Sequence, residues 1–101
     1  IGINAAARDQ VLRLAALADK AGVGGLVCSG MEVEILRKEF GDRFTLVTPG
    51  IRPGTASHDQ KRVTTPAAAV AAGADYLVIG RAITEAENPI EVVDSIVSSI
   101  S

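Results

Sequence analysis

Apolar residues recur along this chain at helical spacing in some stretches and form short unbroken runs in others. Residues 5–21, with Asn4 as the N-cap residue, place theirs at the i, i+3, i+4 and i+7 positions of one helix face (Val11, Leu14, Ala15 and Ala18). A second set of apolar residues at helical spacing, near residue 101, predicts a last helix and consists of Ile90, Val93, Ile96, Val97 and Ile100. Residues 25–28 form a short unbroken apolar run, which is typical of a strand covered on both faces, and residues 44–48 and 76–79 are predicted as the second and third strands.

Capping residues mark where the other predicted helices begin and end. Ser29 and Glu32 have the Ser-x-x-Glu form of a capping box, which opens a helix that runs to about Phe40. Two further helices, at residues 67–72 and after residue 88, open on an N-cap residue followed by proline. These pairs are Thr65-Pro66 and Asn88-Pro89. Gly22, Gly41 and Gly73 stand where three of the predicted helices stop.

The predicted order alternates helices with strands at about 30 residues per unit, which indicates a parallel sheet with right-handed crossovers. Three strands are few for a stable doubly wound sheet. They fit better as three of the eight strands of a (β/α)8 barrel, whose usual length is about 250 residues. A piece with three strands would expose two sheet edges and the apolar face meant for the barrel interior.

The composition excludes several classes of function. A formal charge of −2 over 101 residues gives no basic surface for nucleic acid. No apolar run approaches the roughly 18–20 residues that span a bilayer, so no membrane partner is expected. Cys28 is the single cysteine, which favours a reducing compartment and a role as a small core residue. We therefore expect a cytoplasmic protein.

Polar stretches follow the three predicted strands directly. In parallel α/β folds, ligands bind at the carboxyl ends of the strands, and these ends meet at one edge of the sheet. The stretches begin at Ser29, Pro49 and Gly80. The second continues to the N-cap at Thr65, far beyond the about 4–6 residues of a usual connection, and such a length is typical of a binding loop.

Gly80 and Arg81 form the most informative of these stretches. A glycine directly after a strand lets backbone N–H groups approach an anion, and a short helical turn, predicted at residues 82–87, points its N-terminus at the same place. Arg81 would add a charge-assisted contact, and Arg52 leaves the Pro-Gly turn after the neighbouring strand. When each arginine is taken alone, the alternative to anion binding is an ordinary loop residue that contacts only solvent. Together they favour an anion site.

Other polar residues in this region have simpler interpretations. Gln60 would donate an amide hydrogen to the same ligand or remain solvated. Ser29 is interpreted first as a helix cap, with its hydroxyl still available to a ligand at the barrel mouth. His58 is predicted to be exposed. The sequence assembles no acid–base pair, metal cluster or nucleophile with a base, so no catalytic residue and no metal ligand is assigned.

Several strings, taken together, resemble the C-terminal part of bacterial orotidine 5′-phosphate decarboxylases. They are Val47-Thr-Pro-Gly-Ile-Arg-Pro53, Asp59-Gln-Lys-Arg62 followed by Thr65-Pro66, Asp75-Tyr-Leu-Val-Ile-Gly-Arg81 with Ile83-Thr84, and Gly25-Leu-Val-Cys-Ser29. The resemblance covers essentially the whole chain in order and spacing. It implies a parallel (β/α)8 TIM barrel, in which residues 1–101 would be about the last three β/α units of a single domain with the preceding helix.

The resemblance also implies an activity. The family converts orotidine 5′-monophosphate to uridine 5′-monophosphate and CO2 in de novo pyrimidine biosynthesis, without cofactor or metal and usually as a homodimer. By match to the family strings, the phosphate would be held by Arg52, Gln60, Gly80 and Arg81. Ser29 would reach the pyrimidine, and Pro49 would line the apolar pocket near the base.

One signature of that family is missing. The string Asp-x-Lys-x-x-Asp, which carries the lysine that protonates the carbanion-like carbon, does not occur in this sequence. Residues 1–101 are therefore not expected to catalyse decarboxylation alone. Two alternatives stay open. One is a related sugar-phosphate barrel enzyme, such as a hexulose-phosphate synthase, and the other is a noncatalytic phosphate-binding half-barrel or fragment.

Overall fold

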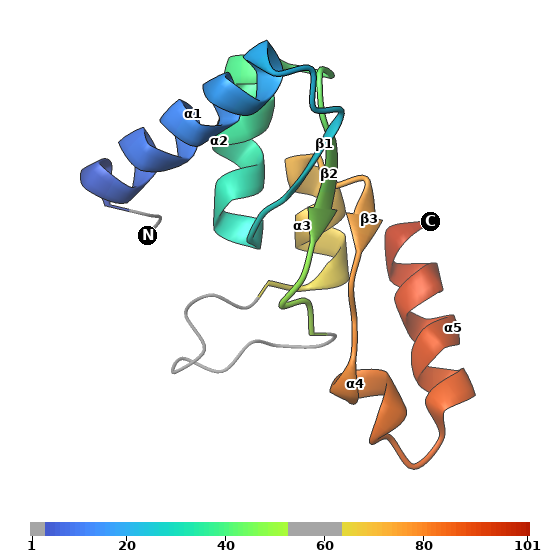
Figure 1. The fold of residues 1–101 in the computed structure, drawn as a ribbon. Coiled ribbons are helices and arrows are strands. Elements are labelled where there is room, and N and C mark those ends of the chain that lie inside the picture. Colours follow the sequence, from blue (N-terminus) through green and yellow to red (C-terminus); the bar gives the residue numbers. More distant parts are fainter. Residues whose placement is uncertain (1–3, 53–63) are drawn as a thin grey trace.

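The computed structural model describes residues 4–52 and 64–101, and its elements follow the predicted order (Figure 1). They are α1 (Ala5–Lys20), β1 (Gly25–Val27), α2 (Gly30–Phe40), β2 (Thr45–Thr48), α3 (Pro66–Ala72), β3 (Tyr76–Leu77), α4 (Arg81–Thr84) and α5 (Pro89–Ile100). The longer helices match the predicted ranges closely. The strands are shorter than predicted, most of all β3, and α4 ends at Thr84 where the prediction extended to residue 87.

The predicted capping residues explain why the helices begin where they do. Asn4 accepts a hydrogen bond from the Ala7 amide at 2.9 Å and so caps α1. The same bond is made at the starts of α3 and α5, where Thr65 accepts from Ala68 at 3.2 Å and Asn88 accepts from Glu91 at 3.3 Å. Each side chain satisfies an amide that has no intrahelical partner.

The strands form one parallel sheet in the order β1-β2-β3. Leu26 lies opposite Leu46 and Val47 lies opposite Tyr76, so the side chains of the three strands share faces in register. Because the strands are parallel, all of their carboxyl ends lie at the same edge of the sheet. The sheet order confirms the predicted parallel arrangement.

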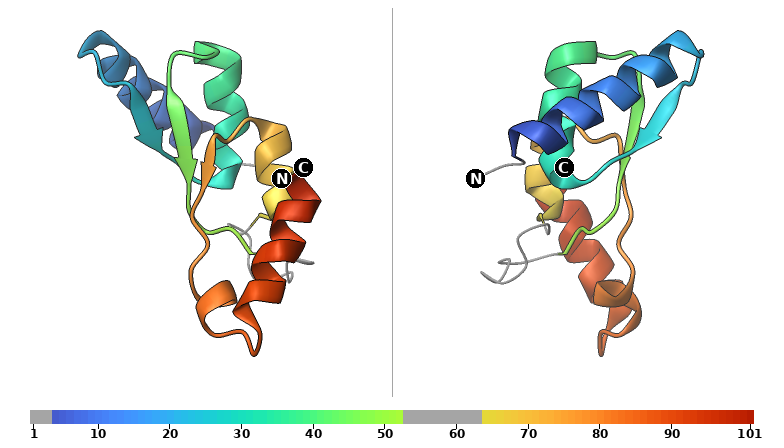
Figure 2. Two further views of the ribbon diagram at one scale, coloured as in Figure 1. Left: turned by 90° about the vertical axis from the view of Figure 1, so that its right-hand side faces the viewer. Right: turned by 60° about the vertical axis from the view of Figure 1, so that its left-hand side comes forward.

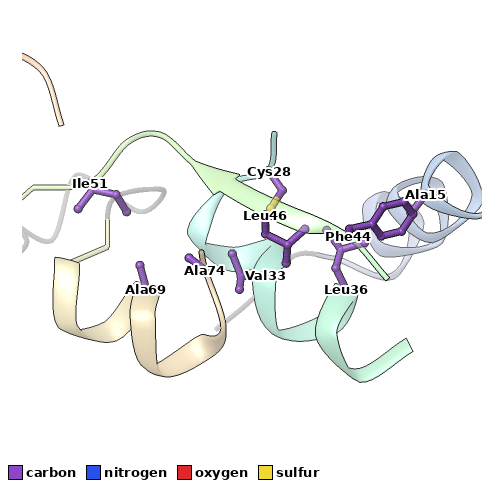
Figure 3. Close-up of a cluster of buried hydrophobic side chains, with 9 residues drawn as sticks. All are labelled: Ala15, Cys28, Val33, Leu36, Phe44, Leu46, Ile51, Ala69 and Ala74. Carbon is purple, nitrogen blue, oxygen red and sulfur yellow. The ribbon is translucent and has the colours of Figure 1, made fainter. Parts of the chain in front are cut away.

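The core lies between the sheet and the helices on one of its sides (Figures 2 and 3). Leu46 is fully buried there, and Cys28 is only 5% exposed, which confirms its prediction as a core residue. The cluster drawn in Figure 3 consists of Ala15, Cys28, Val33, Leu36, Phe44, Leu46, Ile51, Ala69 and Ala74. Burial raises the pKa of the Cys28 thiol, so this residue is held as the neutral thiol.

The opposite face of the sheet carries apolar side chains that the described residues leave exposed. Val27 is 75% exposed, Tyr76 63% and Val78 51%. Side chains alternate between the two faces along a strand, and the register groups these residues on the side away from Leu46. The structure therefore leaves exposed the apolar face that, in the prediction, would line a barrel interior.

The apolar stripe of α5 forms a helix as predicted but is mostly uncovered in the described part of the chain. Ile96 alone among its members is buried. The exposed members are Ile90, Val93, Val97 and Ile100. Some of them border an apolar hollow of about 350 Å³ between α5 and the outer edge of β3.

At the amino end of the sheet, Arg37 of α2 joins several elements. Its Nε donates to the Gly73 carbonyl at the end of α3 at 2.8 Å, and Nη1 donates to the Phe44 carbonyl before β2 at 2.8 Å. Its Nη2 donates to the Asp75 carboxylate, which also accepts from the Leu46 amide at 2.8 Å. We call this arrangement of Arg37 and Asp75 the amino-end clamp.

Candidate functional site

An open pocket of about 290 Å³ lies at the carboxyl ends of β2 and β3. It is lined by Gly50, Ile51, Arg52, Val78, Gly80, Arg81 and Ala82. These residues come from the two segments that directly follow neighbouring strands. The sheet topology therefore builds the pocket at the place where ligands bind in parallel α/β folds.

The segment after β2 reaches the pocket through a tight turn. Gly50 has φ of 73°, a backbone conformation that favours glycine, and the turn sends Ile51 into the core and Arg52 to the surface. Thr64, near the other end of the connection between β2 and α3, holds this segment through two backbone contacts. Ile51 forms a parallel bridge with Thr64, and the Arg52 amide donates to the Thr64 carbonyl at 3.0 Å.

The segment after β3 places backbone N–H groups at the pocket. Gly80 is the N-cap residue of α4, and its carbonyl accepts from the amides of Ile83 at 2.9 Å and Thr84 at 3.1 Å. The amides of Arg81 and Ala82 precede these bonds, and such first amides have no intrahelical partner. A Cβ added to Gly80 would meet no atom of the described residues within 4 Å, so the space beside it is open.

The electrostatics of the pocket favour an anion. Among its described lining residues there are two guanidinium groups and no carboxylate. Both Arg52 and Arg81 are exposed, and therefore available to a ligand. Arginine forms bidentate hydrogen bonds with phosphate and carboxylate groups. This combination of arginines and backbone amides is able to bind an anion of the size of a phosphate group.

Three of the six residues predicted for the site line this pocket, namely Arg52, Gly80 and Arg81. Pro49 and Ser29 lie at the same edge of the sheet but do not line it. Gln60 lies outside the described residues, as do His58 and the other residues between 53 and 63. Arg52 and Arg81 therefore share one pocket, and all six assignments as ligand contacts stay predictions.

Ser29 takes the predicted capping position. It is the N-cap residue of α2, and its amide donates to Oε1 of Glu32 at 2.8 Å. Its side chain is partly buried. These contacts account for the Ser-x-x-Glu string through helix formation.

Four lining residues were not predicted. Ile51, Val78 and Ala82 are apolar neighbours of predicted residues, and their sequence gave no sign of chemistry. Gly50 carried a signal in the Pro-Gly pair, which was interpreted only as the turn that aims Arg52. The described residues contain no cluster of side chains that could hold a metal ion. Among them there is also no helix long and apolar enough to cross a membrane.

Comparison with known proteins identifies a family that matches nearly the whole chain. A sequence model described as the orotidine 5′-phosphate decarboxylase / HUMPS family matches residues 1–96. Two similar curated proteins are the orotidine 5′-phosphate decarboxylases of Actinobacillus succinogenes and Haemophilus influenzae strain PittEE. Each is 63% identical, over 102 and 101 residues respectively, which is 100% and 99% of this chain. The chain spans 44% of the length of either relative.

A solved structure gives the same match in three dimensions. The crystal structure of an orotidine 5′-phosphate decarboxylase from Lactobacillus acidophilus superposes with a TM-score of 0.77 and 37% sequence identity. The superposition covers 93% of this chain and 38% of that one. The three-stranded parallel sheet and its helices thus correspond to part of a larger fold.

Proposed function

The chain belongs to the orotidine 5′-phosphate decarboxylase / HUMPS family and covers part of its (β/α)8 barrel, and from this we propose that it forms the phosphate-binding part of an orotidine 5′-monophosphate decarboxylase. The reaction would yield uridine 5′-monophosphate and CO2 and would need no cofactor. The observation that carries this proposal is the pocket that joins Arg52, Arg81 and the open backbone at Gly80. The names of the curated relatives favour the decarboxylase over a sugar-phosphate enzyme.

In this proposal the pocket binds the 5′-phosphate of the nucleotide. Arg52 and Arg81 neutralise its charge, and the amides after Gly80 donate to its oxygens. Gln60 is proposed as a further phosphate ligand, Ser29 as a contact to the pyrimidine, and Pro49 as part of the apolar wall near the base. The phosphate is remote from the reacting carbon, so these contacts would act through binding energy that stabilises the reactive closed state.

We further propose that residues 1–101 correspond to the last three β/α units of the barrel and the preceding helix. One observation supports this placement. The pocket follows two consecutive strands, and phosphate sites in these barrels are commonly built after strands seven and eight. The exposed inner face around Val27 and Tyr76 fits any part of such a barrel. A cytoplasmic homodimer remains the prediction for the whole enzyme.

The lysine that would protonate the reacting carbon then lies outside residues 1–101. The Asp-x-Lys-x-x-Asp string is absent from this sequence, so residues 1–101 supply binding groups and would not decarboxylate alone. The proton-transfer step is therefore assigned to no residue of this chain. What these residues do is bind and orient the phosphate, which fixes the nucleotide relative to the rest of the site.

The phosphate role is tested by Arg81→Ala in the intact protein. Loss of a charge-assisted hydrogen bond costs about 1.5–3 kcal/mol, so kcat/KM for orotidine 5′-monophosphate should fall roughly 10–100-fold. Decarboxylation of the phosphate-free nucleoside should change little. Arg13→Ala, at an exposed arginine of α1, is the matched control and should leave both values unchanged. Equal losses on both substrates would remove Arg81 from the phosphate site.

A further inference from the structure

The contact between Gly30 and Thr64 links the start of α2 to the phosphate pocket. Thr64 lies next to residue 65, the N-cap of α3, and its carbonyl accepts the hydrogen bond from the Arg52 amide at 3.0 Å. Its side chain rests on Gly30, the first residue of α2. In Figure 1 the lower end of α2 lies above the start of α3, where this contact forms.

The space at Gly30 leaves no room for a side chain. A Cβ built on Gly30 would lie 2.4 Å from Cγ2 and 3.0 Å from Cβ of Thr64. Real Cβ atoms do not come this close to another carbon, so the Thr64 side chain or one of the two backbones would have to shift. Threonine is branched at Cβ and stiff at χ1, which limits how far its methyl group alone can move away.

The backbone of Gly30 does not itself require glycine. Gly30 is absent from the glycines with positive φ, which are Gly22, Gly41, Gly50 and Gly73. Alanine is also in general a better helix former than glycine. Local helix energetics therefore favour alanine at this position, and the close approach of Thr64 opposes it. The glycine is explained by its neighbour and not by its own conformation.

We infer that Gly30 is a positioning residue for the phosphate pocket, acting through Thr64 on Arg52. A side chain at Gly30 pushes Thr64 away from α2. Thr64 carries the carbonyl that holds the Arg52 amide, so the displacement moves Arg52 relative to Arg81 on the other side of the pocket. This inference rests on the proposed function, because it takes the ligand of the pocket to be the nucleotide phosphate.

The test compares Gly30→Ala, Thr64→Ser and the double variant in the intact protein. Misplacing a binding group by about 1 Å costs on the order of 100-fold, so Gly30→Ala should reduce kcat/KM for orotidine 5′-monophosphate by roughly 10–100-fold. The loss should appear in kcat as well as in KM, because the phosphate contacts stabilise the reactive closed state, and the phosphate-free nucleoside should be processed as before. Adding Thr64→Ser removes the methyl group that a Cβ at position 30 would strike and should recover most of the loss.

Gly24→Ala is the matched control, because a Cβ there meets nothing within 4 Å of the described residues. It should leave all values unchanged. A second readout is hydrogen exchange of the Arg52 amide, which should become faster in Gly30→Ala and slow again in the double variant. Should Gly30→Ala fail to fold, Thr64→Gly loosens the same contact from the other side and should selectively weaken use of the phosphorylated substrate.

The outcomes separate this inference from the proposed function. If Arg81→Ala impairs only the phosphorylated substrate while Gly30→Ala impairs neither substrate or both equally, the positioning role is wrong and the phosphate site stands. If Arg81→Ala shows no selective loss, the phosphate site itself is wrong. A selective loss in Gly30→Ala that Thr64→Ser does not relieve would also overturn the coupling through Thr64.

Discussion

Thr48, at the end of β2, is the one fully buried polar side chain of the described core. It is 0% exposed, and its Oγ1 has no hydrogen-bond partner of good geometry among the described residues. The Cys28 thiol is close enough for the Thr48 hydroxyl to lower its pKa, although burial outweighs this and raises the pKa overall. A hydroxyl that loses water without gaining a partner costs about 1–3 kcal/mol.

Replacing this hydroxyl by a methyl group should stabilise the protein. Thr48→Val keeps the shape of the side chain and the preference for strand conformation, and the free energy of unfolding should rise by about 1 kcal/mol. Urea denaturation of the intact protein measures the change. Thr45→Val in the same strand is the control, because Thr45 is exposed and its replacement should stay within about 0.5 kcal/mol. A loss of stability in Thr48→Val would show that the thiol is a true partner.

Only the polar stretches of the site could be predicted from the sequence. Gly80 and Arg81 follow a strand directly, and Arg52 follows a Pro-Gly turn, so their place at the sheet edge follows from strand order alone. Thr64 carried no such signal. Its two contacts, with Gly30 and with the Arg52 amide, join residues far apart in the sequence, and no spacing rule connects them.

At the scale of elements, the amino-end clamp determines how α2 is held against the strand starts. The hydrogen bond from the Leu46 amide is the main cause that lowers the pKa of Asp75, and Arg37 adds to it. A carboxylate whose pKa is lowered in the folded state contributes stability above its unfolded pKa of about 3.9. That contribution is lost as the pH falls through the lower, folded pKa.

Asp75→Asn should therefore destabilise the protein at neutral pH and flatten the acid side of its stability profile. Asparagine carries no charge to attract Arg37, whereas the native carboxylate keeps its charge until the pH falls through its lowered, folded pKa. The difference between the two proteins should be full above the unfolded pKa of about 3.9 and should shrink as the pH falls through the lower, folded pKa. Thermal unfolding across this range, with the exposed Asp42→Asn as control, measures it. A constant difference at every pH would contradict the role of the charge.

Helices were predicted more accurately than the contacts between elements. Capping residues are local, so Asn4, Thr65 and Asn88 marked helix starts that the structure reproduces. The clamp was not predicted, because Arg37 looks like an ordinary basic residue in a last helical turn. Its partners Gly73 and Asp75 lie 36 and 38 residues further along the chain.

At the scale of the whole molecule, the sheet has one covered face and one exposed face. Helices cover Leu46 and its neighbours, whereas Val27 and Tyr76 on the other face meet no described residue that buries them. Isolated exposed apolar residues are ordinary, but a face that is apolar across three adjacent strands marks a surface that another part of a protein covers. The sequence predicted this exposure from the small number of strands.

Substitution of a residue on this face by lysine tests whether further barrel strands cover the face. Val27 and Val23 are both exposed here, at 75% and 45%, so a lysine at either site should be harmless if no further strands cover this face. In a complete barrel, position 27 faces the packed interior, and Val27→Lys should lower the free energy of unfolding of the intact protein by several kcal/mol, about 2–5. Val23→Lys, in the turn after α1, should stay within about 0.5 kcal/mol. Denaturant titrations of the two variants make the comparison, and equal, small effects would mean that the inner face is not covered.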